Sequence, residues 1–300
     1  MTTPQPGIFV EGSRFGQFME YTIKAGVALS EIRADLDRIV HSGPRSVNLV
    51  ATFGYNLWRL LNPEAIPEGF RSFETLKDDN GEVVIPSTQG DIMLWVHSDE
   101  HDDLVDAVIR INELMGQIAT LQTDVSTFVY RDSRDLTGFV DGSANPKGDD
   151  RLPVALIPDG EAGASGSFVL SQKWNHNLQE FNKLNVPEQE GVIGRTKSDS
   201  IELEGDEMPP TSHVSRTDFK ENGKAYKLYR RSMPFADGHQ KGLYFVAFSC
   251  ELERYDVLLN RMVGHWQDGL KDRLMEFTKA EKSSFWFAPS MDDLSAALQR

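Results

Sequence analysis

Two stretches of the chain carry apolar residues at every third or fourth position, and this spacing restricts the folds open to it. The first stripe consists of Ala25, Leu29, Ile32, Leu36 and Ile39, and the second of Leu104, Val108, Ile111, Met115 and Ile118. Such spacing predicts amphipathic helices. Runs rich in apolar or β-branched residues flank both, at 17–23, 46–53, 91–97 and 124–130. These runs predict strands, so the first half has the β-α-β-β-α-β order of a ferredoxin-like antiparallel sheet.

The second half repeats this order in outline. We expect strands at 167–174, 226–231, 242–251 and 284–288, and helices at 175–184, 254–263 and 270–278. The segments 62–90 and 185–211 show little periodicity and are expected to be irregular. The chain is therefore predicted to be α+β, with two ferredoxin-like halves built on antiparallel sheets.

The segment 145–166 separates the two halves. It is dense in turn-forming residues and has little periodicity of its own. We place a domain boundary here, which gives domains 1–150 and 151–300. A chain of 300 residues is also longer than one ordinary core supports, in agreement with two domains.

Composition excludes several classes of protein. A net charge of −15 argues against nonspecific nucleic-acid binding, which needs Lys and Arg against phosphates. Cys250 is the only cysteine, so an intrachain disulfide and a cysteine-based metal cage are impossible. The sequence has no signal-peptide pattern and no apolar run of the length that a membrane helix needs. We expect a cytoplasmic protein with no membrane partner.

Two titratable residues lie in unusual local sequences. His213 follows Met208-Pro209-Pro210-Thr211-Ser212, which cannot be regular helix because proline lacks an N–H. Asp141 lies between Gly138 and Gly142, which permit positive φ and close backbone approach. Taken by themselves, the ordinary readings are favoured for both: a loop-exposed histidine, and an aspartate that hydrogen-bonds the backbone of its own turn.

Two further charged segments have ordinary explanations. Arg230 and Arg231 end a strand-like run, so one faces inward and must meet an anion, unless both form a surface pair. Segment 131–135 (RDSRD) is expected to be a solvated polar turn without chemistry. His97 and His101 stand four positions apart, but no H-E-x-x-H motif exists, and we predict no multi-histidine metal site.

Short segments along nearly the whole chain resemble one family. They are GIFVEG (7–12), FGYNLWRLL (53–61), DLTGFVDGSANP (135–146), WNHNLQEFNKL (174–184), VIGRTK (192–197), TSHVSRTD (211–218), YRRSMPF (229–235), GLYFVAFS (242–249), FTK (277–279) and FWFAPS (285–290). In this order and spacing they resemble the dye-decolorising peroxidase family, and within it the compact, cytoplasmic B-type branch.

The resemblance implies a haem b site in the C-terminal half, with His213 as the axial ligand of the iron. Asp272 is similar to the acid that accepts a hydrogen bond from this histidine, although Asp268 lies one helical turn away and is an alternative. Arg195 is expected near a haem propionate.

On the distal side, the resemblance implies that Asp141 is the acid–base residue and Arg230 the distal arginine. Ser143 and Ser232 match small polar positions that complete the distal pocket. Asp141 would take a proton from hydrogen peroxide and return it to the leaving oxygen, and Arg230 would stabilise the developing charge. Because a free aspartate has a pKa of about 3.9, an acidic pH optimum for dye oxidation is expected.

The family implies a peroxidase that reduces hydrogen peroxide through a ferryl intermediate and oxidises dyes, phenols or similar donors. The alternative is a porphyrin- or haem-handling protein, acting in haem transport or iron release, which would use His213 but would not need Asp141 and Arg230. A haem-free hydrolase lacks support because no G-x-S-x-G elbow is present. The resemblance also implies a homo-oligomer. Residues 290–300 read as a short terminal helix, so no tail for docking into a protein shell is expected.

Overall fold

The first half of the chain forms the ferredoxin-like unit that its periodicity predicts. A computed structural model describes residues 2–41, 43–44 and 46–299. The elements of this half are β1 (Phe15–Ile23), α1 (Leu29–His41), β2 (Asn48–Phe53), β5 (Ile92–Ser98), α3 (His101–Ile118) and β6 (Ala119–Phe128). The strands lie in the order β2-β5-β1-β6, with every pair antiparallel. The predictions for these elements are confirmed to within a few residues at their ends.

The second half uses the same strand order. Its principal elements are β7 (Ser167–His176), β10 (Tyr229–Arg230), β11 (Met233–Ala236), β12 (Lys241–Ser249), α8 (Glu253–Val263) and β13 (Thr278–Ala288). β12 lies between β7 and the short strands β10 and β11, while β13 pairs with the other edge of β7. The predicted α+β class with antiparallel pairing is therefore confirmed.

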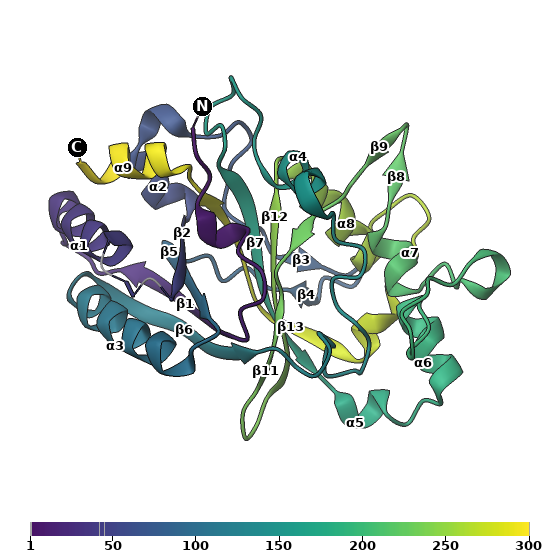
Figure 1. The fold of residues 1–300 in the computed structure, drawn as a ribbon. Helices are drawn as coiled ribbons and strands as arrows, with labels where there is room; N and C mark the ends of the chain where they lie inside the picture. Colours follow the sequence, from purple (N-terminus) through teal and green to yellow (C-terminus); the bar gives the residue numbers. More distant parts are fainter. Residues whose placement is uncertain (1, 42, 45, 300) are drawn as a thin grey trace.

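A single contact of the two half-sheets makes one continuous nine-stranded sheet (Figure 1). β13 meets β2 where Phe287 pairs with Phe53. The sheet curls strongly, so β6 approaches β11, and the Thr127 hydroxyl lies 3.5 Å from the Met233 sulfur. Inside the curl, the Tyr244 hydroxyl donates a 2.6 Å hydrogen bond to Glu20. One apolar core therefore fills the concave side, and a second lies beneath the helices on the outer side.

Shorter elements complete the chain. The helical ones are η1 (Pro6–Ile8), α2 (Tyr55–Leu61), η2 (Pro63–Ala65), η3 (Gly148–Arg151), α4 (Leu152–Ala155), α5 (Leu178–Phe181), α6 (Val186–Ile193), η4 (Gly205–Glu207), α7 (His213–Thr217), η5 (Arg273–Glu276) and α9 (Met291–Gln299). Two small hairpins pair β3 (Leu76–Lys77) with β4 (Val83–Ile85), and β8 (Lys220–Glu221) with β9 (Lys224–Ala225). The predicted terminal helix is α9, and Arg300 lies outside the described residues.

Several predictions for the second half are wrong. The helix expected at 270–278 is only the 3-10 turn η5, because the Asp272 side chain caps Leu274 N–H and β13 already begins at Thr278. The helix expected at 175–184 shortens to α5, since β7 continues to His176. The strand expected at 226–231 is reduced to the two residues of β10.

Two segments expected to be irregular contain structure. Residues 185–211 hold α6, which begins with a capping box between Asn185 and Glu188. The segment 62–90 holds η2 and the β3–β4 hairpin. Both were missed because these elements are too short to show a clear period. Within the described residues, no helix is long and apolar enough to span a membrane.

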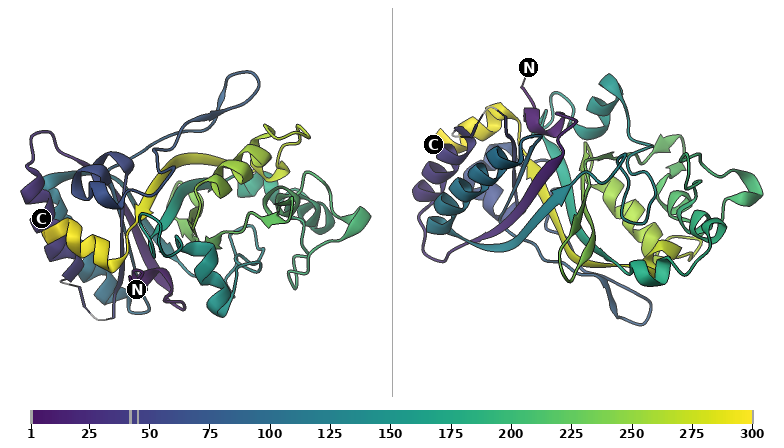
Figure 2. Two further views of the ribbon diagram at one scale, coloured as in Figure 1. Left: turned by 90° about the horizontal axis from the view of Figure 1, so that it is seen from above. Right: turned by 60° about the horizontal axis from the view of Figure 1, so that its bottom comes forward.

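The two halves differ in what covers the outer face of their sheet. In the first half, α1 and α3 pack against it side by side (Figure 2). In the second half, α8 covers the sheet, and its Tyr255 hydroxyl bonds to the carbonyls of Phe168 and Ala247. The other connection, residues 177–228, carries α5, α6 and α7 and extends away from the sheet. This difference creates the cavity described next.

Candidate active site

A largely apolar cavity lies between the second half-sheet, α8, α7 and the loop at 140–144. The sheet contributes Leu170, Gln172, Trp174, Leu243 and Phe245, and α8 contributes Tyr255, Leu258, Leu259 and Met262. The polar side chains that reach this cavity include Asp141, Ser143, Arg195, His213 and Arg230. Five residues selected from the sequence are thus brought together from segments far apart in the chain.

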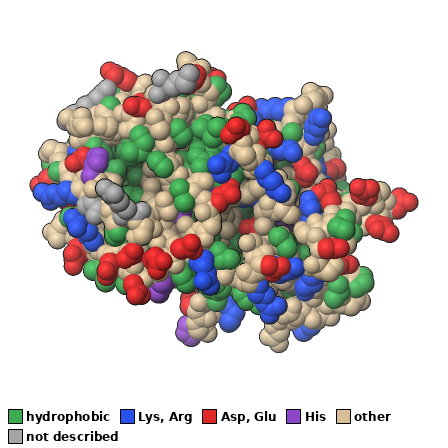
Figure 3. Space-filling view, in the orientation of Figure 1, with side chains coloured by type: hydrophobic (Ala, Val, Ile, Leu, Met, Phe, Trp, Pro, Cys, Tyr) green, Lys and Arg blue, Asp and Glu red, His purple; other side chains and the backbone are tan. Residues whose placement is uncertain are grey.

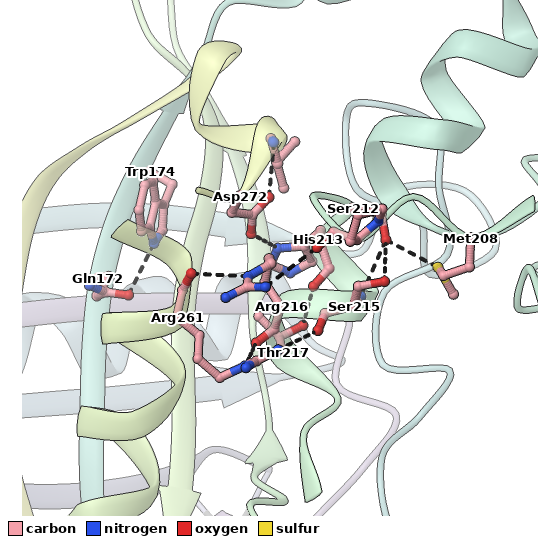
Figure 4. A network of polar contacts seen from close by, with 12 residues as sticks. Gln172, Trp174, Met208, Ser212, His213, Ser215, Arg216, Thr217, Arg261 and Asp272 are labelled. Atoms are coloured by element: carbon pink, nitrogen blue, oxygen red, sulfur yellow. Dashed lines mark hydrogen bonds and ion pairs between the residues drawn. The ribbon is translucent and has the colours of Figure 1, made fainter. Parts of the chain in front are cut away.

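His213 is the first residue of α7 and points its ring into the cavity. Ser212 caps the helix by accepting a hydrogen bond from Ser215 N–H. The Nδ1 atom of His213 lies 2.7 Å from the Asp272 carboxylate (Figure 4), whose side chain is fully buried. Since Nδ1 is engaged by a carboxylate, Nε2 is left for a ligand in the cavity.

The structure distinguishes between the two aspartates considered as partners of His213. Asp272 contacts His213, and its other oxygen caps η5. Asp268 instead forms a bidentate pair with Arg216, at 2.7 and 2.9 Å. The pairing with Arg216 lowers the pKa of Asp268 to about 2. Asp268 therefore anchors α7 and does not contact the histidine.

Asp141 lies on another wall of the cavity, in a tightly folded loop. Its N–H donates to Ser133 O at 3.0 Å, and an isolated bridge pairs Arg134 with Val140. Gly138 has a φ of +90°, and a Cβ there would lie 2.7 Å from the Lys197 side chain. A residue other than glycine at 138 would be strained by this φ, and the end of the Lys197 side chain would have to move. Burial raises the pKa of the Asp141 carboxyl, and the charge of Arg230 opposes that rise.

Arg230 is held by its backbone. Asn145 accepts a hydrogen bond from Arg230 N–H at 3.1 Å and donates one to Arg230 O at 2.7 Å. The Nε atom of Arg230 is buried and has no hydrogen-bond partner within the described part of the chain. A buried, unpaired guanidinium N–H is costly, which indicates that an anionic group belongs in this space.

Arg231 faces the other side of the sheet and is only partly exposed. It donates to the carbonyls of Ile8 and Val10, and its guanidinium lies 5.1 Å from the centre of the Trp95 ring. Of the two adjacent arginines, Arg230 therefore serves the cavity, and Arg231 fixes the N-terminal segment to the sheet.

The remaining predicted residues lie at the margins. Ser143 lines the cavity from the exposed part of the loop. Arg195 lines it too, but its guanidinium pairs with Glu202 and donates to Ser200 O. Ser232 lies outside this cavity and lines a second one, which shares Asp141 and Arg230 with the first.

One pair of residues near the cavity was missed. Asp135 was assigned to a solvated turn, yet its side chain is only 14% exposed and lies 3.1 Å from Nε2 of His176. His176 and Thr278 both line the cavity, and the Thr278 hydroxyl lies 2.7 Å from Nδ1 of His176. Because Asp135 and His176 are 41 positions apart, no local pattern reveals their contact.

Comparison with known proteins places this geometry in a family. The family model described as Dyp-type peroxidase, C-terminal, matches residues 132–293, and the model described as Dyp-type peroxidase, N-terminal, matches residues 5–129. The chain belongs to the Dyp-type peroxidase family. It is therefore an enzyme, a peroxidase of this type, as the resemblance in the sequence implied.

Individual relatives agree with this assignment. A dye-decolorizing peroxidase of Mycobacterium tuberculosis is 31% identical over 89% of this chain and 81% of the relative. A dye-decolorizing protein from V. cholerae is 33% identical, covers 98% of both chains and has a TM-score of 0.86. A variant of DypB from Rhodococcus jostii RHA1, solved in complex with haem, is 29% identical, covers 97% of both chains and has a TM-score of 0.89.

The donor set suits a haem better than a bare metal ion. Among the described residues, no group of three or more His, Cys, Asp or Glu side chains could hold a metal ion. A haem needs one axial protein ligand, apolar walls and a cation for its propionates. His213, the leucine-rich lining and the unpaired Nε of Arg230 supply these three features.

Charge on the surrounding surface is mixed. On the face shown in Figure 3, acidic side chains gather along the lower left, and basic and acidic side chains are interspersed elsewhere. With a net charge of −15, this face gives no indication of a nucleic-acid partner.

Proposed function

We propose that this chain is a haem b peroxidase of the B-type branch, which reduces hydrogen peroxide and oxidises dyes, phenols or similar donors. The observation that carries the proposal is the arrangement of one cavity: the His213–Asp272 pair on one wall, and Asp141 with Arg230 on another. The DypB structures, at 29–31% identity, support the branch and the haem.

His213 would bind the haem iron through Nε2. Its partner Asp272 accepts the Nδ1 proton, which fixes the ring orientation and makes the imidazole a stronger electron donor. The haem, when bound, supplies an iron that accepts electrons from the donor and passes them to peroxide. The short helix α7, capped by Ser212 and anchored through Arg216 and Asp268, holds the ligand in place.

Asp141 would move the peroxide proton. As a carboxylate it accepts a proton from one oxygen, and as an acid it donates that proton to the oxygen that leaves as water. A raised pKa favours this exchange, because a stronger base accepts the proton more readily. Arg230, fixed by Asn145, would stabilise negative charge as the oxygen–oxygen bond breaks.

A spectroscopic experiment tests the proposal. The purified protein is loaded with haem, its absorption spectrum is recorded before and after one equivalent of peroxide, and His213→Ala is treated in the same way. We expect histidine-ligated haem that reacts rapidly with peroxide, and loss of this ligation in the variant. Retained ligation in His213→Ala would overturn the ligand assignment. Stable haem binding without any reaction with peroxide would favour haem transport or iron release.

We also propose a cytoplasmic location and a homo-oligomeric state, which the family resemblance supports. The lone cysteine, Cys250, is buried and unpaired, in keeping with a reducing compartment. Light scattering of the purified protein tests the oligomeric state, since a monomeric mass near 33.7 kDa would contradict it.

A further inference from the structure

Asp135 and His176 form an enclosed pair at the edge of the haem cavity. The His176 side chain is 7% exposed, and both of its ring nitrogens are engaged, one by Asp135 and one by Thr278. The second oxygen of Asp135 accepts hydrogen bonds from the backbone N–H of Thr137, at 2.8 Å, and from the Thr137 hydroxyl. An aspartate with this many donors around it is stabilised as the carboxylate.

The same folded loop carries Asp135 and Asp141. Asp135 N–H donates to Phe139 O, Gly138 N–H donates to Asp135 O, and the Arg134–Val140 bridge closes the loop beside them. The two carboxylates are thus held in one rigid turn and differ in their surroundings. His176 and Thr137 surround Asp135 with donors, whereas Asp141 faces the apolar cavity.

The two carboxyl groups accordingly shift in opposite directions. Burial raises the pKa of Asp141, and the negative charge of Asp135 raises it further. Burial also opposes ionisation of Asp135, but the charge of His176 and the hydrogen bonds from His176 and Thr137 together hold its pKa below the ordinary value. Neighbouring carboxyls whose surroundings separate their protonation states commonly divide acid and base roles.

We propose that Asp135, kept ionised by His176, is a positioning residue whose fixed negative charge makes the peroxide-facing Asp141 a stronger base. The inference rests on the proposed function, because it assigns Asp141 a proton-transfer role. Asp135 and Asp141 lie in the same hairpin, 135–141, and Asp135 affects the reaction only through the effect of its charge on Asp141.

Other charged groups also face Asp141. Arg230 of β10 favours its carboxylate form, and a backbone hydrogen bond from Gly142 does the same. His213 of α7 also faces the cavity, but as the proposed iron ligand it is a neutral imidazole. Arg134 lies beside the loop, but its guanidinium is occupied by Asp132 and by the carbonyls of Gly138 and Lys197. Among these groups, Asp135 alone adds negative charge, so its removal has a predictable sign.

The test is the Asp135→Asn variant of the haem-loaded enzyme, in which an isosteric amide removes the charge. Protonation of Asp141 is followed by infrared difference spectroscopy against Asp141→Asn, alongside the pH profile of the reaction with peroxide. We expect both midpoints to move to lower pH, by roughly half to one unit. Asp135→Glu retains the charge and should keep both midpoints near wild type.

A matched control removes the same charge from the same loop. Asp132 is 64% exposed and pairs with Arg134, so Asp132→Asn should leave both midpoints unchanged because solvent screens that charge. If Asp135→Asn does not fold, Asp135→Ser provides the same charge removal. An unchanged or raised Asp141 midpoint in a folded, charge-removed variant would overturn the proposal.

The infrared and kinetic readings separate two failures. If the wild-type enzyme does not react with peroxide, the proposed function fails, while the infrared midpoint still reports whether Asp135 acts on Asp141. If peroxide reacts normally and the infrared midpoint does not move, only the role of Asp135 fails.

Discussion

The carboxylate of Asp272 lies 2.7 Å from Nδ1 of His213, with its own side chain completely enclosed. A buried carboxylate so placed fixes the histidine's ring and tautomer, and its loss typically costs about 10- to 100-fold in metal affinity or activity. We therefore expect Asp272→Asn to bind haem more weakly and to react with peroxide more slowly by a factor in that range. Haem titration and stopped-flow kinetics measure both effects.

Asp268→Asn is the natural control for that experiment. It removes an aspartate four positions away that pairs with Arg216 and does not contact His213. Because Asp268 anchors α7, its loss should slow the reaction with peroxide, but by less than the loss of Asp272, since the hydrogen bond to Nδ1 of His213 remains. Equal losses in the two variants would show that the region matters only for folding.

Asp141→Asn should slow the reaction with peroxide by about 100-fold or more, the usual contribution of a positioned acid–base group. Haem binding should be retained, because Asp141 lies on a different wall from His213. Stopped-flow measurement of the bimolecular rate constant checks this. A wild-type rate would assign bond cleavage chiefly to Arg230.

The pH dependence of the same reaction follows from the raised pKa of Asp141. Its base form is needed, so the rate constant should rise with pH through a midpoint above the value of about 3.9 for a free aspartate. This rise of the rate constant with pH should be absent in Asp141→Asn. If the midpoint stays at or below the free value, burial does not control this carboxyl.

Stability should depend on pH through His97. Burial lowers the pKa of this histidine to about 4, and its ring bonds Ser13 and Gly7 O. The unfolded chain binds a proton below about 6.5 and the native chain only below about 4. The contribution of His97 to the free energy of unfolding is therefore fully present above pH 6.5. The free energy of unfolding should fall by roughly 3 kcal/mol as the pH drops to 4.

Urea unfolding at several pH values tests this expectation. His97→Gln should lose stability at neutral pH, but its unfolding free energy should change less between pH 6.5 and 4. His41→Gln changes an exposed histidine and should retain the wild-type slope. A wild-type slope in His97→Gln would mean that other groups cause the acid sensitivity.

Elements with long, regular periods could be predicted from the sequence. The stripes of α1 and α3 each extend over several turns, and both helices are found close to the expected residues. The helix expected near Asp272 fails for a local reason. Asp272 uses one oxygen to cap Leu274 and the other to bind His213, and this arrangement allows only a short 3-10 turn.

The site was predictable only in part. The sequence around His213 and around Asp141 does not by itself identify either as a functional residue. Both were predicted because they lie in segments that resemble one family. Asp135 was missed because its burial depends on His176, a strand residue far away in the chain. Hydrogen-bond partners of this kind are set by the strand order and cannot be read from spacing.

The extended connection at 177–228 gives the second half an incomplete interior. In the first half, α1 and α3 pack directly on the sheet. In the second half, Leu170, Leu243 and Phe245 of the sheet line a cavity instead. A prosthetic group seated there replaces the missing helix as packing material, so it completes the hydrophobic core as well as the chemistry. Under the proposed function, haem loading would then add to the stability of this half, because a ligand that binds only the folded chain stabilises it.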